Sequence, residues 1–303
     1  MARSARSHQS TVRITLDAPE ELVLSGVRLA GTKQTVFYQA IREWKTSKAT
    51  QRVATVRQTE MIRAEILRVF GYAVSTEQLW DTTYFFDFSR PVRDFLWKSL
   101  HDAHHIGTYW KHIPDCEARM TCQVCGVTED LAHILLKCEA PGQNEVWAVT
   151  RELWQRKHPE WPELTVGTLL GCGLARFQSA RNVAGIQQLY RILISESMFV
   201  IWKLRNERVI QRAGAELPLQ EILNKWNQAI VSRFEIDRVL ANRPRHGKRA
   251  SIDPGRVIET WSAVLVNEEN LRKEWLRLAG VLVGSTEIAS RALQTRTVRH
   301  GEG

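Results

Sequence analysis

The feature of this sequence that most constrains its fold is a group of three cysteines and one histidine between residues 122 and 138. The spacing is C-x2-C-x7-H-x4-C, and the members are Cys122, Cys125, His133 and Cys138. Two thiolates two residues apart can turn back onto one ion when a glycine follows, as Gly126 does here. The histidine and the last cysteine can complete a tetrahedron from a short helix. The spacing therefore predicts one bound Zn²⁺ that organises the middle of the chain.

The protein supplies all four ligands, so the predicted zinc ion is structural and has no open position for an activated water. Two other interpretations stay open. The four residues could be buried near one another by chance, or the first pair could be a redox motif, although no thioredoxin-like βαβ pattern surrounds it. Cys116 and His112 are close enough in sequence to replace a ligand, whereas Cys172, between two glycines, is expected to be a small buried residue.

Apolar residues recur at helical spacing through most of the chain. The clearest helix has Ser89 as its N-cap, Pro91 in its first turn and an apolar face from Val92 to Ala103. Ser75 and Gln78 have the spacing of a capping box. Further helices are expected around residues 34–44, 61–70, 146–154, 186–214, 222–234 and 261, and a short strand over residues 12–16. The prediction is a mainly α protein in which a small CCHC zinc-binding module is inserted between amphipathic helices.

Changes in composition along the chain suggest four segments. Residues 1–70 are expected to be a basic tail and a helical remnant, and residues 71–160 hold the predicted zinc-binding domain. Residues 161–185 contain four glycines and are expected to form a linker. Residues 186–303 are expected to form a C-terminal helical region.

The net charge of +9 and the isoelectric point near 9.5 favour a polyanionic partner such as RNA or DNA. Ten Lys or Arg and four acidic residues lie in residues 1–58, and residues 242–249 form a second basic segment. Trp110 or Tyr109 could stack on an unpaired base, although core packing is the alternative for both. The cations expected to contact nucleic acid flank the zinc ligands or lie in the second basic segment: Lys98, Lys111, Arg119, Lys137, Arg243, Arg245, Lys248 and Arg249.

Membrane insertion and secretion are not expected. Apolar runs such as residues 197–202 end long before the ~20 residues that span a bilayer, and residues 1–10 lack the apolar centre of a signal peptide. Five cysteines are an odd number, which does not suit a disulfide framework. We therefore expect an intracellular protein, nuclear or cytoplasmic, and the sequence offers no motif for a small-molecule substrate.

One stretch resembles a known family. Residues 88–98 read FSRPVRDFLWK, residues 122–126 read CQVCG and residues 129–138 read EDLAHILLKC, with Trp147 following. In order and spacing they resemble the reverse-transcriptase zinc-binding domain. The wider chain resembles the C-terminal part of fungal non-LTR retrotransposon polyproteins, in which this domain follows reverse transcriptase and ribonuclease H. Residues 22–42 resemble the end of the ribonuclease H region, and segments within residues 170–174, 190–197 and 235–238 resemble the trailing part of the same elements.

The resemblance implies a mobile-element fragment that lacks both polymerase and nuclease sites. Ribonuclease H needs a carboxylate cluster for two Mg²⁺ ions, and reverse transcriptase needs paired aspartates, whereas this chain has no Asp-Asp pair. We therefore expect no enzyme activity, with residual nuclease activity as the enzymatic alternative. The leading hypothesis is a zinc-stabilised nucleic-acid-binding module. The alternative is a helical protein-interaction or scaffolding region that does not bind nucleic acid on its own.

Overall fold

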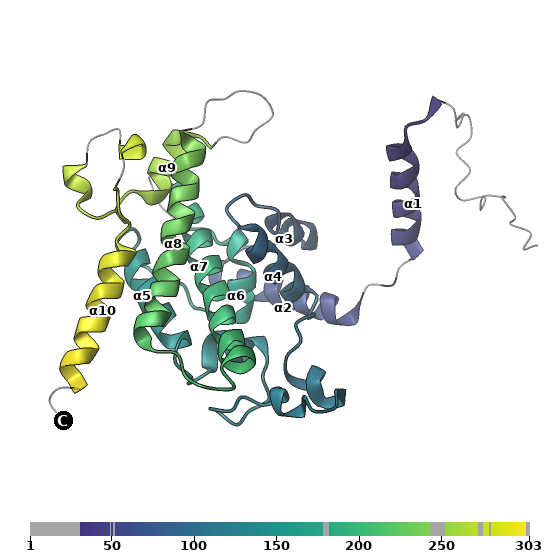
Figure 1. Cartoon of the computed structure of the whole chain (residues 1–303). Helices are drawn as coiled ribbons and strands as arrows, with labels where there is room; N and C mark the ends of the chain where they lie inside the picture. Colours follow the sequence, from purple (N-terminus) through teal and green to yellow (C-terminus); the bar gives the residue numbers. More distant parts are fainter. Residues whose placement is uncertain are drawn as a thin grey trace, which may run out of the picture. The chain divides into compact units, whose positions relative to one another are not determined.

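The structure, a computed structural model, describes residues 31–48, 50, 52–177, 182–242, 252–271, 275–278 and 280–300. Over these ranges the protein is mainly helical and contains no sheet, which confirms the predicted fold class (Figure 1). The α-helices are α1 (Gln34–Lys48), α2 (Val53–Phe70), α3 (Thr76–Thr82), α4 (Arg90–Leu100), α5 (Gln143–Gln155), α6 (Val166–Leu170), α7 (Val183–Asn206), α8 (Leu219–Ala241), α9 (Pro254–Trp261) and α10 (Ser285–His300). Short 3-10 helices are η3 (Gly107–His112), η4 (Glu117–Met120), η6 (Cys172–Leu174), η8 (Glu268–Asn270) and η9 (Trp275–Arg277), and π-helical turns are η5 (His133–Lys137) and η7 (Glu207–Gln211).

The chain divides into two compact units between Arg52 and Val53. Helix α1 belongs to the first unit and contains no buried residue. All the other helices belong to the second unit, and the four predicted metal ligands lie there as well. The proposed borders at residues 70, 160 and 185 stay predictions.

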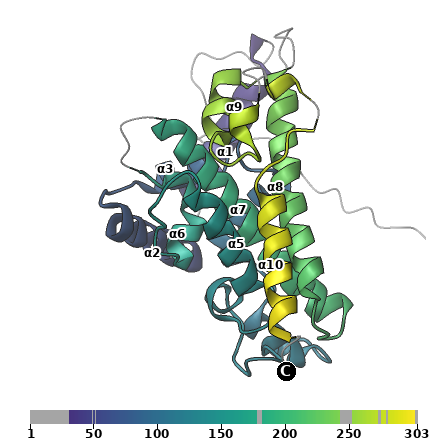
Figure 2. The same cartoon turned by 90° about the vertical axis from the view of Figure 1, so that its left-hand side faces the viewer.

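Helix α7 is the centre of the second unit. It packs against α5, α8 and α9 along its length, and α10 lies against α5 and α8 (Figure 2). Sixteen of its 24 residues are buried, as expected for a helix surrounded by others. Ser197 of α7 accepts a hydrogen bond from Trp226 Nε1 of α8 at 3.1 Å, and its hydroxyl lies 2.7 Å from that of Thr150 of α5. This buried polar junction fixes the relative register of three helices, because an unpaired hydroxyl in such a core would be costly.

Several tryptophans anchor the helix packing. Trp154 of α5, Trp226 of α8 and Trp261 of α9 are fully buried, and each indole nitrogen has a hydrogen-bond acceptor. A buried aromatic side chain removes roughly 150–250 Å² from water, so each of these residues contributes several kcal/mol to the burial free energy. The dispersed tryptophans of the sequence thus include core anchors rather than members of one aromatic platform.

Helices α3 and α4 form where the sequence predicts them. The Gln78 N–H donates to Ser75 Oγ at 3.2 Å and the Ser75 N–H donates to Gln78 Oε1 at 2.9 Å, which confirms the capping box of α3. Helix α4 begins after an extended Ser89 with Pro91 in its first turn. Its predicted apolar face is buried from Val92 to Leu100, so α4 enters the core immediately before the cysteine segment.

The glycine-rich stretch at residues 161–185 includes the short helix α6, where a loop is expected from sequence. Thr165 caps the helix by accepting a hydrogen bond from the Thr168 N–H at 3.1 Å. Gly167 faces α2 so closely that an added Cβ would lie 2.5 Å from Glu65 Cβ. This glycine therefore allows two helices to approach closely. In the sequence alone, a glycine of this kind cannot be told from one in a flexible turn.

Some expectations fall outside the described residues. They are the strand at residues 12–16, the basic tail and the cations Arg243, Arg245, Lys248 and Arg249. Within the described helices, none is both long and apolar enough to cross a membrane.

Candidate metal centre

The first two cysteines lie in a tight loop that one isolated β-bridge closes. Thr121 and Thr128 form an isolated antiparallel bridge, and inside it the Cys122 N–H donates to the Val127 carbonyl at 2.9 Å. The Gly126 N–H donates back to the Cys122 carbonyl at 2.8 Å. Gly126 has a φ of +70°, a left-handed conformation that a side chain would strain. The glycine lets the chain reverse directly after Cys125.

The other two members lie at the two ends of the π-helical turn η5. Asp130 starts this segment, because its Oδ1 accepts a hydrogen bond from the His133 N–H at 2.6 Å. In a regular α-helix residues i and i+5 point about 140° apart, at 3.6 residues per turn. A π-turn bonds residue i to residue i+5 and so brings His133 and Cys138 toward the same side. The wider turn explains how an H-x4-C spacing can serve one site.

These local structures bring the ligand atoms of Cys122, Cys125, His133 and Cys138 within 4.8 Å of one another. The Sγ atoms of Cys122 and Cys138 are 3.8 Å apart, too far for a disulfide. Two sulfurs at ~2.3 Å from one ion in tetrahedral geometry would be separated by roughly 3.8 Å. The Cys3His group could therefore hold a metal ion. Among the described residues, this group includes neither Cys116 nor His112.

The surroundings of the group fit a cation. His133 is 6% exposed, and its buried Nε2 has no hydrogen-bond partner within the described part of the chain. An orphaned buried nitrogen is costly unless something occupies its lone pair or proton. The Glu139 N–H donates to Cys125 Sγ at 3.3 Å, and such a bond stabilises the charge of a thiolate. A bound metal ion would give His133 Nε2 a partner and would pair with the negative charge of the Cys125 thiolate.

The two buried thiols differ in acidity. Burial opposes ionisation of Cys122, but hydrogen bonds with the Cys125 N–H, the His133 side chain and the Val124 N–H outweigh it and lower the pKa of this thiol to about 7. Burial raises the pKa of Cys138 to about 11, against the opposing effects of the Ala140 N–H and of Arg208. The Arg208 guanidinium approaches Cys138 Sγ at 3.9 Å from the helix-α7 side. A bound metal ion would keep both sulfurs deprotonated, since a coordinating thiol loses its proton.

Three contacts hold residues 121–138, the metal-ligand loop, in place. Glu129 and Arg205 of α7 form a buried ion pair whose side chains are 1% and 7% exposed, with Arg205 Nε donating to Glu129 Oε1 at 3.2 Å. The Trp147 indole of α5 donates to the Leu135 carbonyl of η5 at 2.7 Å. Gly107 lies against the loop so closely that a Cβ there would meet the Glu129 carbonyl oxygen at 2.1 Å. The orientation of the loop is thus fixed from three sides.

Of the cations predicted to contact nucleic acid, the four that the structure describes, Lys98, Lys111, Arg119 and Lys137, are exposed but do not all line one pocket. Lys98 lies on α4 and is paired with Asp94 at 2.8 Å, and Arg119 of η4 covers the Trp110 ring at 5.1 Å. These residues line one pocket. Lys111 and Lys137 do not line that pocket.

Sequence reasoning missed the contribution of helix α7 to this region. Phe199, Trp202 and Arg205 follow one another at intervals of three and line the same pocket as Trp110. Their spacing predicts a shared helix face, but it does not indicate which other segment that face meets. Arg208 had no sequence signal at all.

Together the fold and the site define a helical protein with a Cys3His group that could hold a metal ion. Comparison of the chain with known protein families, with curated proteins and with solved structures finds no match.

Proposed function

We propose that Cys122, Cys125, His133 and Cys138 hold one structural zinc ion, and that the module organised by this ion binds RNA or DNA. The observation that carries the proposal is the convergence of four ligand atoms within 4.8 Å from two separate turns of the chain. Three thiolates and one imidazole suit Zn²⁺, which takes such ligands tetrahedrally. With all four positions supplied by protein, the ion would act by stabilising the fold.

Charge and aromatic side chains support the second half of the proposal. The whole chain carries a net charge of +9, and exposed Lys98, Lys111, Arg119 and Lys137 flank the metal ligands in the sequence. Trp110 and Tyr109 are at least partly exposed in the same segment. Cations for phosphates together with rings for bases are the elements of single-strand binding.

The resemblance of residues 88–147 to the reverse-transcriptase zinc-binding domain supports an origin in a retrotransposon polyprotein. Glu129, Trp147 and helix α4 with its Trp97-Lys98 pair belong to that resemblance, and in the structure Glu129 and Trp147 hold the metal-ligand loop. We infer no catalytic role for the chain, because the sequence supplies neither of the carboxylate arrangements that nuclease or polymerase chemistry needs.

Changing Lys98, Lys111, Arg119 and Lys137 together to Gln is expected to weaken binding of a single-stranded oligonucleotide without regard to its sequence. Each lost phosphate contact flattens the slope of log K against log salt by ~0.7, so the combined slope should fall by up to about 3. Fluorescence anisotropy at several salt concentrations measures both quantities. A second variant replaces Arg243, Arg245, Lys248 and Arg249 and tests the other basic segment in the same way.

A control variant changes Arg57 of α2 and Arg277 of η9 to Gln, which removes two exposed charges outside the metal-ligand loop. It should leave the salt slope close to that of the unaltered chain. A chain that binds no oligonucleotide at low salt, but associates with protein partners independently of salt, would be a scaffolding region instead.

A further inference from the structure

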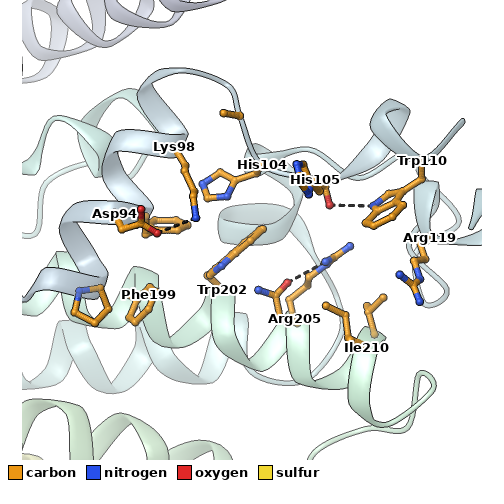
Figure 3. Close-up of a pocket in the computed structure, with 15 residues that line it drawn as sticks. Asp94, Lys98, His104, His105, Trp110, Arg119, Phe199, Trp202, Arg205 and Ile210 are labelled. Carbon is orange, nitrogen blue, oxygen red and sulfur yellow. Dashed lines mark hydrogen bonds and ion pairs between the residues drawn. The ribbon is translucent and has the colours of Figure 1, made fainter. Parts of the chain in front are cut away.

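A pocket of about 450 Å³ lies beside the metal-ligand loop (Figure 3). Its walls come from α4, from residues 103–119 and from the end of α7 with the π-turn η7. The second wall leads directly into Cys122, and Arg205 from the third wall pairs with Glu129 of the loop. The volume is within the range of small-ligand sites, roughly 300–1,000 Å³.

Aromatic rings form much of the pocket. Trp202 lies against His104, with 4.4 Å between ring centroids, and Phe95 packs on both of them. Burial lowers the pKa of His104 to about 4, so this ring is neutral at physiological pH and its Nε2 lies 2.8 Å from Ser99 Oγ. This part of the pocket is therefore aromatic and uncharged.

One end of the pocket carries a second ring in a fixed orientation. The Trp110 indole donates to the His105 carbonyl at 2.9 Å, which holds the ring at the edge of the pocket. Figure 3 shows Trp110 and Arg119 at this end, Lys98 at the opposite end and Trp202 between them. Trp110 and Trp202 are both only partly buried, so each ring has surface left for a ligand.

The charged groups at the rim select the kind of ligand. Within the described residues, Arg119 forms no ion pair and is held only over the Trp110 ring at 5.1 Å. Lys98 is paired with Asp94, but both side chains are about half exposed, and exposed pairs of this kind are weak enough for a phosphate to compete. Arg205 is already neutralised by Glu129. The pocket thus combines ring faces with cations at two ends, which is complementary to a planar base joined to phosphates.

We propose that this pocket binds one unpaired base of a single-stranded nucleic acid, with the base stacked on Trp110 and the adjoining phosphates on Arg119 and Lys98. The inference rests on the proposed nucleic-acid-binding function and makes it specific. A base within a duplex is stacked between its neighbours and cannot enter, so the pocket selects single strands or frayed ends.

The experiment measures the affinity of the full, zinc-loaded chain for a fluorescein-labelled 15-nucleotide single strand and for the matching 15-base-pair duplex. Trp110→Ala is expected to weaken single-strand binding about tenfold or more, since stacking on one aromatic ring is a large part of the affinity per base. Duplex binding should change less than twofold. Trp110→Phe keeps a ring and should restore most of the affinity, and Arg119→Gln should reduce it severalfold.

Trp97→Ala is the matched control, because Trp97 is an exposed tryptophan of α4 that does not line the pocket. Its affinity for the single strand should stay within twofold of the unaltered chain. A strand carrying 2-aminopurine gives a direct signal, since a stacked 2-aminopurine loses fluorescence. The quench should appear with the unaltered chain and with Trp97→Ala, and it should be lost in Trp110→Ala.

The outcomes separate the two proposals. Single-strand binding that is unchanged by both Trp110→Ala and Arg119→Gln overturns the pocket and leaves the nucleic-acid-binding function standing. Absence of binding to either probe removes the function and the pocket together. If Trp110→Ala loses its zinc or no longer unfolds cooperatively, its affinity cannot be interpreted, and the test is then the 2-aminopurine signal of the unaltered chain. Binding of the strand without a loss of 2-aminopurine fluorescence would overturn the pocket.

Discussion

Replacing His133 by Ala, or Cys125 by Ser, is expected to release the zinc ion and to unfold the region from about residue 116 to residue 147. Three ligands cannot close the tetrahedron, and structural zinc in finger peptides contributes apparent binding free energies of ~10–16 kcal/mol. Before Glu129 this region has little else to hold it, whereas Leu131, Ile134, Leu135, Val146 and Trp147 also pack into the main core. Helix η4 buries no residue, and the small apolar cluster at the site consists of Cys122, Cys138 and Ala140.

Two measurements check this prediction. Elemental analysis after exhaustive dialysis should give about one zinc per unaltered chain and none per variant. Hydrogen exchange followed by mass spectrometry should show lost protection at the metal-ligand loop, while α7 and α8 keep theirs because they belong to the main core.

Cys116→Ser is the control for this pair of variants. Cys116 lies only six residues before Cys122 but is outside the ligand group, so its replacement should leave the zinc content unchanged. If both ligand variants retain their metal, the site has been assigned to the wrong residues.

The second large effect is expected at the buried ion pair between Glu129 and Arg205. Arg205→Met should lower the free energy of unfolding by about 3–5 kcal/mol, because it leaves the Glu129 carboxylate buried and unpaired. Replacing both partners, with Glu129→Leu and Arg205→Met, should recover most of that loss, since no uncompensated charge remains. Urea denaturation of the two single variants and the double variant gives the coupling energy.

An exposed ion pair at the same pocket provides the comparison with the buried pair. Lys98 and Asp94 are 46% and 62% exposed, so Asp94→Asn should change the free energy of unfolding by at most about 1 kcal/mol. A loss below 1 kcal/mol in Arg205→Met as well would mean that Glu129 and Arg205 do not hold the loop to α7.

Much of the local structure follows from sequence rules that act over a few residues. The capping box at Ser75, the proline and apolar stripe of α4 and the C-x2-C turn with Gly126 are all determined by neighbours in the chain. The grouping of the four ligands could be predicted for the same reason, because all of them lie within 17 residues.

The remainder depends on contacts between distant segments. The partner of Glu129 lies 76 residues away, and the pocket combines α4 with a helix face that begins about 100 residues later. Helix α6 was not predicted, because its glycines are typical of a loop, whereas in the structure they allow close packing on α2. Periodicity identifies such helix faces but not the segments that they contact. The four metal ligands could therefore be predicted from the sequence, whereas the pocket beside them could not.

The central claim is that one zinc ion is held by three sulfurs and one nitrogen of this chain. X-ray absorption at the zinc edge of the purified, zinc-loaded protein tests it most directly. We expect a four-coordinate shell with three sulfurs at about 2.3 Å and one nitrogen at about 2.0–2.1 Å. A shell dominated by oxygen, or one with two sulfurs or fewer, would contradict it.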